Sequence, residues 1–236
     1  MKRTVIITGG TKGLGRETAL AFARNGCFVI ALYASDAPAA QEFETLLSAS
    51  RLSGLSLRHD VCEEKAGPWN HPEIQSADHL TLVHNACAPF VPMPMHQLTW
   101  SDFDHNHRVA IKGAWECSQP LLRLMLRKKA GTIITVLSAA IENLPPKGFA
   151  AYVTAKHALR GFTLSLAAEY ASRGLKIFSV SPGYMETPLT AQWDERLRQM
   201  SRDHSDRITI PAVAARQIVA LAESAETPGH GENHAL

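Results

Sequence analysis

Short runs of β-branched and other apolar residues alternate along the chain with longer stretches in which apolar residues recur at helical spacing. The short runs predict strands at residues 4–8, 27–32, 55–59, 80–84, 132–137 and 176–180. The longer stretches predict helices near residues 13–25, 37–50, 100–129 and 150–173. After Asp60 the pattern is interrupted by Gly67, Pro68 and Pro72, which disfavours a helix there.

Strand and helix alternate over the whole length, and this favours a parallel sheet covered by helices on both faces. Neither an internal repeat nor a linker is visible in the sequence. We therefore predict an α/β fold with a single domain spanning residues 1–236.

Composition narrows the possible functions. Of the 236 residues, 45% are hydrophobic and 19% are charged, which supplies a full core and excludes dominant disorder. The net charge is +2 without a block of like charges, so neither nucleic acid nor an anionic membrane is an expected partner. No apolar run approaches the ~20 residues of a membrane span, and the strand pattern starts too early for a signal peptide.

Cysteine and histidine patterns give no metal or disulfide signal. The four cysteines are widely spaced and form no C-x-x-C pair, which predicts reduced thiols and a cytoplasmic protein. The close histidines His105 and His107 lie in a polar helical stretch where their side chains point in different directions. We therefore predict no metal site.

Polar and glycine residues follow the predicted strands. The stretches after the strands read "TGGTKGLG", Asp60-Val61, "HNAC", "SAA" and "SPGYMETP". Because the carboxyl ends of parallel strands meet at one edge of the sheet, these residues predict a ligand site there.

The first of these stretches, residues 8–15, follows a strand and opens a helix. Gly9 permits a tight turn, Gly13 permits close approach of the backbone to a pyrophosphate, and Gly15 permits close helix packing. The free N–H groups at the helix start would then face the phosphates. A tight turn without a ligand is the alternative, whereas a P-loop is disfavoured because no Gly-Lys-Ser/Thr closes the stretch.

The end of the second strand bears on the choice of dinucleotide. An acidic residue usually binds the ribose 2′-hydroxyl of NAD at this place, but here the strand ends in Tyr33, Ala34 and Ser35, and Asp36 comes later. Lys12 and Ser35 are suited to a 2′-phosphate, which favours NADP(H) over NAD(H). The alternative is that Lys12 is merely solvated.

Several further motifs appear in a characteristic order. Tyr152 lies four residues before Lys156, a spacing that is weak evidence by itself. Together with the glycine stretch, Asn85-Ala86, Ser138 and "PGYMET" at 182–187, it resembles the short-chain dehydrogenase/reductase family over residues 4–223. The resemblance implies a doubly wound, Rossmann-type sheet of about seven strands, a nicotinamide cofactor and hydride transfer at a carbonyl or alcohol carbon.

The family resemblance also implies roles for individual residues. Tyr152 would exchange a proton with the substrate oxygen, and Lys156 would lower the phenol pKa and hold the ribose hydroxyls. Ser138 would hydrogen-bond the substrate oxygen, although a strand-end cap is the alternative for this residue. The expected cofactor contacts are Gly9, Thr11, Lys12, Gly13, Leu14, Gly15, Ser35, Asp60, Val61, Asn85, Ala86, Tyr152, Lys156, Pro182, Gly183, Met185 and Thr187.

Four departures from the family pattern are visible, and one of them is the spacing of fourteen residues between Ser138 and Tyr152, one more than is usual. Cys87 stands where glycine is usual, and Ala110 stands where an asparagine often completes a proton relay. Asn106, one helical turn earlier, is a candidate substitute, and water alone is the alternative. The end of the chain, residues 230–236, predicts only a short last strand.

We predict that a lid at about residues 184–210 covers the substrate pocket. Its apolar underside and the basic residues at its rim suit an acyl chain on an acidic carrier. The chain is similar to 3-oxoacyl-acyl-carrier-protein reductases, so a small-molecule or carrier-bound carbonyl is expected. A basic run, Arg123, Arg127, Lys128 and Lys129, is a candidate carrier surface or a solvated helix end.

The helix predicted at 150–173 is apolar on more than one face, which predicts a homodimer or homotetramer unless the 100–129 helix covers it. The leading function is an NADPH-dependent carbonyl reductase. An NAD-linked alcohol or sugar dehydrogenase, and a dinucleotide-binding sensor or scaffold without turnover, stay open as alternatives.

Overall fold

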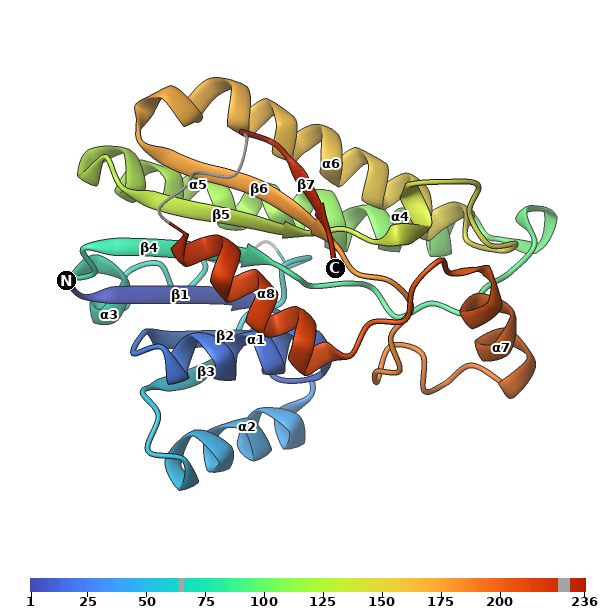
Figure 1. Ribbon diagram of the computed structural model, residues 1–236, viewed down its shortest axis with the longest axis horizontal. Coiled ribbons are helices and arrows are strands. Elements are labelled where there is room, and N and C mark those ends of the chain that lie inside the picture. Colours follow the sequence, from blue (N-terminus) through green and yellow to red (C-terminus); the bar gives the residue numbers. More distant parts are fainter. Residues whose placement is uncertain (64–65, 225–229) are drawn as a thin grey trace.

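The computed structural model describes residues 1–63, 66–224 and 230–236 (Figure 1). The strands are β1 (Arg3–Thr8), β2 (Phe28–Tyr33), β3 (Gly54–Arg58), β4 (His79–His84), β5 (Gly131–Val136), β6 (Leu175–Ser181) and β7 (Asn233–Ala235). The α-helices are α1 (Gly13–Arg24), α2 (Ala37–Ala49), α3 (Pro72–Gln75), α4 (Trp100–His107), α5 (Gly113–Lys128), α6 (Ala150–Tyr170), α7 (Glu195–His204) and α8 (Pro211–Glu223).

The strands form one seven-stranded parallel sheet in the order β3-β2-β1-β4-β5-β6-β7. The chain moves outward from β1 to β3, returns to the centre at β4 and then moves outward in the opposite direction. This confirms the doubly wound fold, and it places the expected ligand crevice beyond the carboxyl ends of β1 and β4. The short last strand is also present, because β7 pairs with the end of β6.

Alternate residues of the central strands enter separate cores on the two faces of the sheet. Val5, Ile7 and Val29 pack on the face covered by α1, α2 and α8. Ile6 and Ile30 pack on the opposite face, against α5 and α6. Because both faces are covered, the central strands are buried almost throughout, as expected of a parallel sheet.

Several helices differ from the sequence-based expectation. The short α3 forms at Pro72–Gln75, where the prolines disfavoured a helix, and α7, inside the predicted lid, was not among the predicted helices. The helix predicted at 100–129 is divided into α4 and α5 by a wider π-helical turn at Arg108–Lys112. Beside this turn Gly113 packs on Val61, and a Cβ at Gly113 would lie 2.7 Å from Val61 Cγ2. Helix α8 was not among the predicted helices, although Pro211 occupies its first turn and its buried residues recur at helical spacing.

Candidate active site

A cavity of about 850 Å³ lies beyond the carboxyl ends of the strands. Every residue predicted for catalysis or cofactor contact lines it, from Gly9 after β1 to Thr187 after β6. The volume is in the range typical of sites for small molecules and cofactors. The sheet edge therefore gathers side chains that are far apart in the sequence.

The glycine loop has the conformation that the sequence predicts. Gly9 and Gly13 both have positive φ, 64° and 57°. A Cβ at Gly15 would lie 2.2 Å from the Gly9 carbonyl oxygen, so only glycine lets α1 approach the loop this closely. The side chain of Lys12 does not cap α1, so the first N–H groups of the helix stay available to an anion. These features fit the pyrophosphate of a dinucleotide.

Asn85 fixes this loop against β4. Its side-chain amide donates to the carbonyl oxygens of Thr8 and Gly9, at 3.0 and 3.1 Å. In return, the backbone N–H groups of Asn85 and Ala86 each donate to Thr8 Oγ1 at 3.0 Å. Asn85 thus bridges the two central strands at the edge where the cavity begins.

The far end of the cavity contains an ion pair. Lys12 Nζ lies 2.7 Å from Asp36 Oδ2, and Asp36 Oδ1 also accepts from the backbone of Ala39 at the start of α2. The hydrogen bond from Lys12 lowers the pKa of Asp36. In this arrangement a carboxylate partly neutralises the cation that was predicted to face a 2′-phosphate.

Ser138, Tyr152 and Lys156 meet at the near end of the cavity. Ser138 follows β5 and hydrogen-bonds the Tyr152 hydroxyl. Tyr152 and Lys156 lie on one face of α6, and the Lys156 ammonium is 5.7 Å from the centre of the Tyr152 ring. Lys156 is buried and donates to the Val136 carbonyl oxygen at 2.7 Å. The hydroxyls of Ser138 and Tyr152 and the ammonium of Lys156 thus lie at the same end of the cavity.

The structure corrects the expected pKa of Tyr152. Burial raises the pKa of this phenol, with a smaller contribution from Cys87, and the hydrogen bond from Ser138 only partly opposes the rise. Burial also lowers the pKa of Lys156. The spacing of Tyr152 and Lys156 reveals the neighbouring cation, but it does not reveal burial. Here burial has the larger effect on the pKa of Tyr152.

Tyr152 belongs to a cluster of four aromatic rings. Phe90 stacks on Tyr152, with centroids 4.7 Å apart and 16° between the planes. Phe149 meets both rings edge-on, and Trp193 meets Phe90 and Phe149 edge-on. Trp193 Nε1 donates to the Phe90 carbonyl oxygen at 2.6 Å, which ties the 184–210 segment to the loop after β4. One wall of the cavity is therefore apolar and aromatic.

A second, much smaller cavity of about 10 Å³ lies behind Tyr152. Cys87, Asn106, Ala110 and Lys156 are among its lining residues, so the departures at Cys87 and Ala110 and the candidate substitute Asn106 meet here. Asn106 is buried and its side-chain amide donates to the Asp102 carbonyl oxygen at 3.0 Å. The volume is close to the minimum that holds one water molecule.

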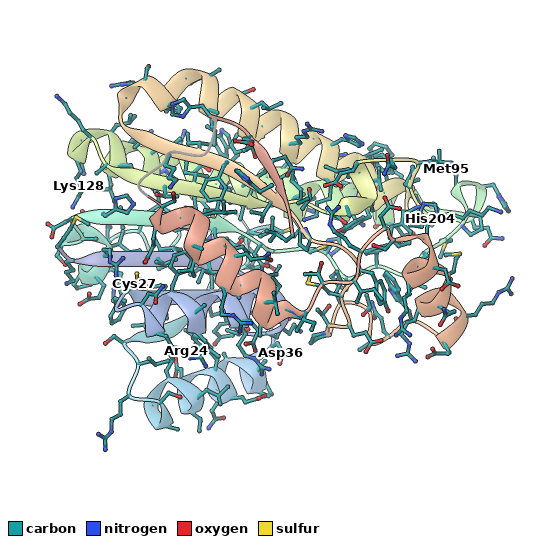
Figure 2. The ribbon with its side chains drawn as sticks, viewed as in Figure 1. Arg24, Cys27, Asp36, Met95, Lys128 and His204 are labelled. Atoms are coloured by element: carbon teal, nitrogen blue, oxygen red, sulfur yellow. The ribbon has the colours of Figure 1, made fainter. Side chains whose placement is uncertain are left out.

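The predicted basic rim is largely paired with acids. Arg202 forms an ion pair with Glu186, and Arg198 forms one with Glu195 at 3.0 Å. The basic run of residues 123–129 lies at the opposite end of the sheet, because α5 leads into the start of β5; Lys128 is far from His204 in Figure 2. Lys128 also donates to backbone carbonyl oxygens of Gln75 and Ala77. The run is therefore not beside the cavity.

Sequence reasoning missed part of the cavity wall. The residues not predicted include Phe90, Asn143, Leu144 and Phe149. Phe149 directly precedes α6, and Phe90 follows the Asn85-Ala86 motif by a few residues, so their proximity to known motifs was the only available signal. In the described part of the chain, no cluster of His, Cys, Asp and Glu is placed to hold a metal, and no helix is long and apolar enough to cross a membrane.

Comparison with known sequences agrees with this geometry. The family model described as "short chain dehydrogenase" matches residues 3–198. Oxidoreductase UcpA of Salmonella typhimurium is 30% identical over 237 residues, covering 95% of this chain and 84% of the relative. The 3-oxoacyl-(acyl-carrier-protein) reductase FabG of Vibrio harveyi is also 30% identical, covering 93% of this chain and 89% of the relative.

Solved structures share the whole fold. A putative NAD(P)-dependent gluconate 5-dehydrogenase from Beutenbergia cavernae, with bound NADP, has a TM-score of 0.85 at 28% identity, covering 99% of this chain and 94% of that one. Acetoin dehydrogenase from Enterobacter cloacae has a TM-score of 0.82 at 25% identity, covering 100% of this chain and 94% of that one. The similar proteins thus include enzymes named for different substrates.

Proposed function

Because the chain belongs to the short-chain dehydrogenase family and is an NAD(P)-dependent oxidoreductase, we propose that it reduces a carbonyl group to an alcohol with NADPH. The observation that carries this proposal is the meeting of Ser138, Tyr152 and Lys156 on the wall of one large cavity. A bound nicotinamide dinucleotide supplies the hydride.

The side chains of the site divide the remaining chemistry. Tyr152 donates its proton to the substrate oxygen as charge develops there, and its raised pKa keeps the phenol in the protonated form that reduction requires. Ser138 donates a hydrogen bond to the same oxygen and stabilises its charge. Lys156 holds the ribose hydroxyls. In the oxidative direction Tyr152 would accept the proton from the substrate hydroxyl.

For the cofactor we propose NADP(H), held by the glycine loop, Ser35 and Lys12 at one end and by the Pro182–Thr187 stretch at the other. Asp60 and Val61 would contact the adenine. The NADP bound to the Beutenbergia relative supports this choice. The ion pair between Lys12 and Asp36 is the one observation that favours the NAD-linked alternative, because it brings a carboxylate to the ribose end.

For the substrate we propose a ketone with an apolar substituent, with a 3-oxoacyl thioester as the leading candidate. The aromatic wall of Phe90, Phe149 and Trp193 suits an acyl chain. The similarity to the Vibrio reductase supports the thioester. The basic run on α5 gives no support to a carrier surface beside the cavity, so a small-molecule ketone is the second candidate within this class.

We propose that Asn106 takes part in the proton relay behind Tyr152. It lines the small cavity together with Lys156, whose ammonium has three donors and a single protein hydrogen bond in the described structure. One water in that cavity would connect the two side chains. Asn106 would then do what an asparagine at position 110 does in the family pattern.

We also propose that the chain forms a homodimer or homotetramer through the outer face of α6. Helix α4 packs against one side of α6, as the alternative interpretation expected. The other side stays open: Leu164 is 46% exposed, and a Cβ at Gly161 would meet nothing within 4 Å. Sedimentation velocity tests this, and a monomer at micromolar concentration would contradict it.

The function is tested by measuring NADPH oxidation with a panel of ketones, diketones and 3-oxoacyl thioesters, with NADH as the comparison. Turnover of at least one apolar ketone or thioester, faster with NADPH, is the expected result. Tight NADPH binding without turnover of any member would identify a sensor instead of an enzyme. Equal or faster rates with NADH would contradict the cofactor proposal alone.

A further inference from the structure

The segment between α7 and α8 is joined to the loop after β6 by backbone hydrogen bonds. The Tyr184 N–H donates to the Arg207 carbonyl oxygen at 3.0 Å, and the Thr209 N–H donates to the Tyr184 carbonyl oxygen at 2.8 Å. A Cβ at Gly183 would lie 2.2 Å from the Arg207 carbonyl oxygen, so this approach requires glycine at position 183. Arg207 therefore has a fixed backbone position beside the Pro182–Thr187 stretch.

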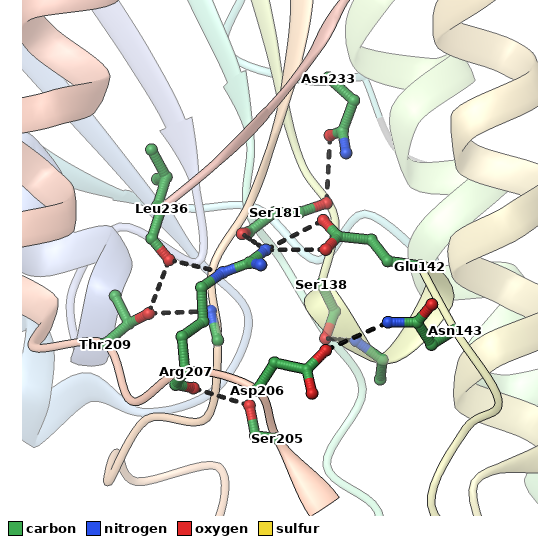
Figure 3. A network of polar contacts seen from close by, with 12 residues as sticks. Ser138, Glu142, Asn143, Ser181, Ser205, Asp206, Arg207, Thr209, Asn233 and Leu236 are labelled. Atoms are coloured by element: carbon green, nitrogen blue, oxygen red, sulfur yellow. Dashed lines mark hydrogen bonds and ion pairs between the residues drawn. The ribbon is translucent and has the colours of Figure 1, made fainter.

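The side chain of Arg207 reaches three further segments (Figure 3). Its Nη2 donates to both carboxylate oxygens of Glu142 at 3.0 Å and to the Ser181 carbonyl oxygen at 2.9 Å. Its Nε donates to the Leu236 carbonyl oxygen at 3.0 Å. One guanidinium thus joins the loop after β5, the end of β6 and the tail after β7.

Neighbouring polar contacts strengthen the same junction. Thr209 Oγ1 accepts from the Gly183 N–H at 2.8 Å and donates to the Leu236 carbonyl oxygen at 2.9 Å. Asn143 Nδ2 donates to Asp206 Oδ2 at 3.1 Å. The arginine is therefore the centre of a network and not an isolated surface pair.

Two of the three joined segments, those of Glu142 and Ser181, lead directly to groups at the proposed reaction centre. Glu142 ends the short turn that begins after Ser138, the hydroxyl that bonds Tyr152. Ser181 immediately precedes the Pro182–Thr187 stretch, which lines the cavity opposite the glycine loop. A rigid link between these two segments sets the distance between the substrate-oxygen donor and the stretch proposed to cover the nicotinamide.

We propose that Arg207 is a positioning residue, which acts through Glu142 and Ser181 to hold Ser138 and the Pro182–Thr187 stretch in register with Tyr152. The guanidinium is well suited to this because its planar fork reaches several oxygens at fixed angles, which an ammonium does not do. The kinetic part of this proposal rests on the proposed function, whereas the link itself does not.

The test compares Arg207→Gln, Arg207→Lys and Glu142→Gln with the wild-type chain. Arg207→Gln is expected to lower kcat about 10- to 100-fold, as for small misplacements of reacting groups, with NADPH affinity nearly unchanged. Arg207→Lys should recover only part of kcat, and Glu142→Gln should lose less than Arg207→Gln because its amide oxygen still accepts. The matched control is Arg3→Gln, which breaks the ion pair with Glu223 at the amino end of β1, away from the cavity, and should change kcat by less than about twofold.

Hydrogen exchange of the uncomplexed protein supplies the readout that is independent of turnover. Faster exchange in residues 138–144 and 181–185 of Arg207→Gln, but not of Arg3→Gln, is expected. Unchanged exchange in these residues would overturn the proposal, and so would an unchanged kcat in an active enzyme. If the wild-type chain has no turnover, the proposed function fails while the exchange data still decide the link. If Arg207→Gln does not fold, Arg207→Lys and Glu142→Gln decide it by the same criteria.

Discussion

The ring of Phe90 lies parallel to the ring of Tyr152, with centroids 4.7 Å apart. The hydroxyl oxygen of Tyr152 lies on the long axis of its ring, so a contact that holds the ring in place also holds the hydroxyl in place. Phe90 comes from the loop after β4 and is tied to the 184–210 segment through Trp193. The apolar wall thus both shapes the cavity and fixes the ring of the proposed proton donor.

Phe90→Leu is expected to lower kcat/KM for apolar ketones about 3- to 10-fold, because an aromatic pair contributes about 0.5–1.5 kcal/mol beyond its buried area. Steady-state kinetics with a short and a long alkyl ketone measure this. Phe103→Leu is the control, since Phe103 stacks on Trp100 and His107 in α4 and does not line the cavity. Equal effects of the two variants would contradict the role of Phe90.

Asp36→Asn is expected to increase the preference for NADPH over NADH about fivefold, in line with the weak energies of exposed ion pairs. Asparagine keeps the N-cap of α2 while it removes the charge that pairs with Lys12. The ratio of kcat/KM for the two cofactors measures the change. Lys12→Gln should move the ratio in the opposite direction, and a shift of both variants in the same direction would show that the pair does not set the preference.

Asn106→Ala is expected to lower kcat by about 3- to 30-fold with unchanged NADPH affinity, less than the loss of a direct proton donor. Adding Ala110→Asn to this variant should restore part of the turnover, because both side chains line the small cavity behind Tyr152. Rates over a pH range measure both effects. Full activity of Asn106→Ala would show that the side chain is not part of the relay.

His84 is expected to make the fold sensitive to acid. Burial lowers the pKa of this imidazole to about 4, while one ring nitrogen shares a hydrogen bond with Ser118 Oγ at 2.9 Å. The unfolded chain therefore binds the proton first as pH falls below about 6.5, and stability that is complete above this pH is lost down to about pH 4. The loss attributable to this residue is about 3 kcal/mol.

Urea unfolding at several pH values measures that dependence. His84→Gln should reduce the slope of the free energy of unfolding between about pH 4 and 6.5 by up to one proton. His59 and His79, whose pKa values burial also lowers, should keep a remaining slope. Identical slopes in the wild-type protein and in His84→Gln would mean that His84 binds its proton in the native state as readily as in the unfolded chain.

The sequence predicted well those features that depend on local order along the chain. Strand ends are local, so the stretch after β1, Asn85 and Ser138 were placed at one edge before the structure was known. The helical spacing of Tyr152 and Lys156 was equally local, and both side chains face the cavity.

Features that depend on how loops cross in space were not predictable. Phe90 and Trp193 are 103 positions apart and meet only because two loops fold over the same edge. The pKa of Tyr152 was misjudged because burial cannot be read from spacing. Of the two interpretations of the basic run on α5, the position of the run favours the solvated helix end. The topology already implies this, since a helix that leads into a parallel strand must end at the amino edge of the sheet.

The central claim is that Tyr152 is the proton donor in a dinucleotide-dependent carbonyl reduction. Its most direct test is the turnover of Tyr152→Phe with NADPH and the best ketone, alongside the dissociation constant for NADPH. A loss of at least about 100-fold in kcat with nearly unchanged NADPH affinity is the predicted result. Turnover equal to that of the wild-type chain would contradict the account, because another group would then supply the proton.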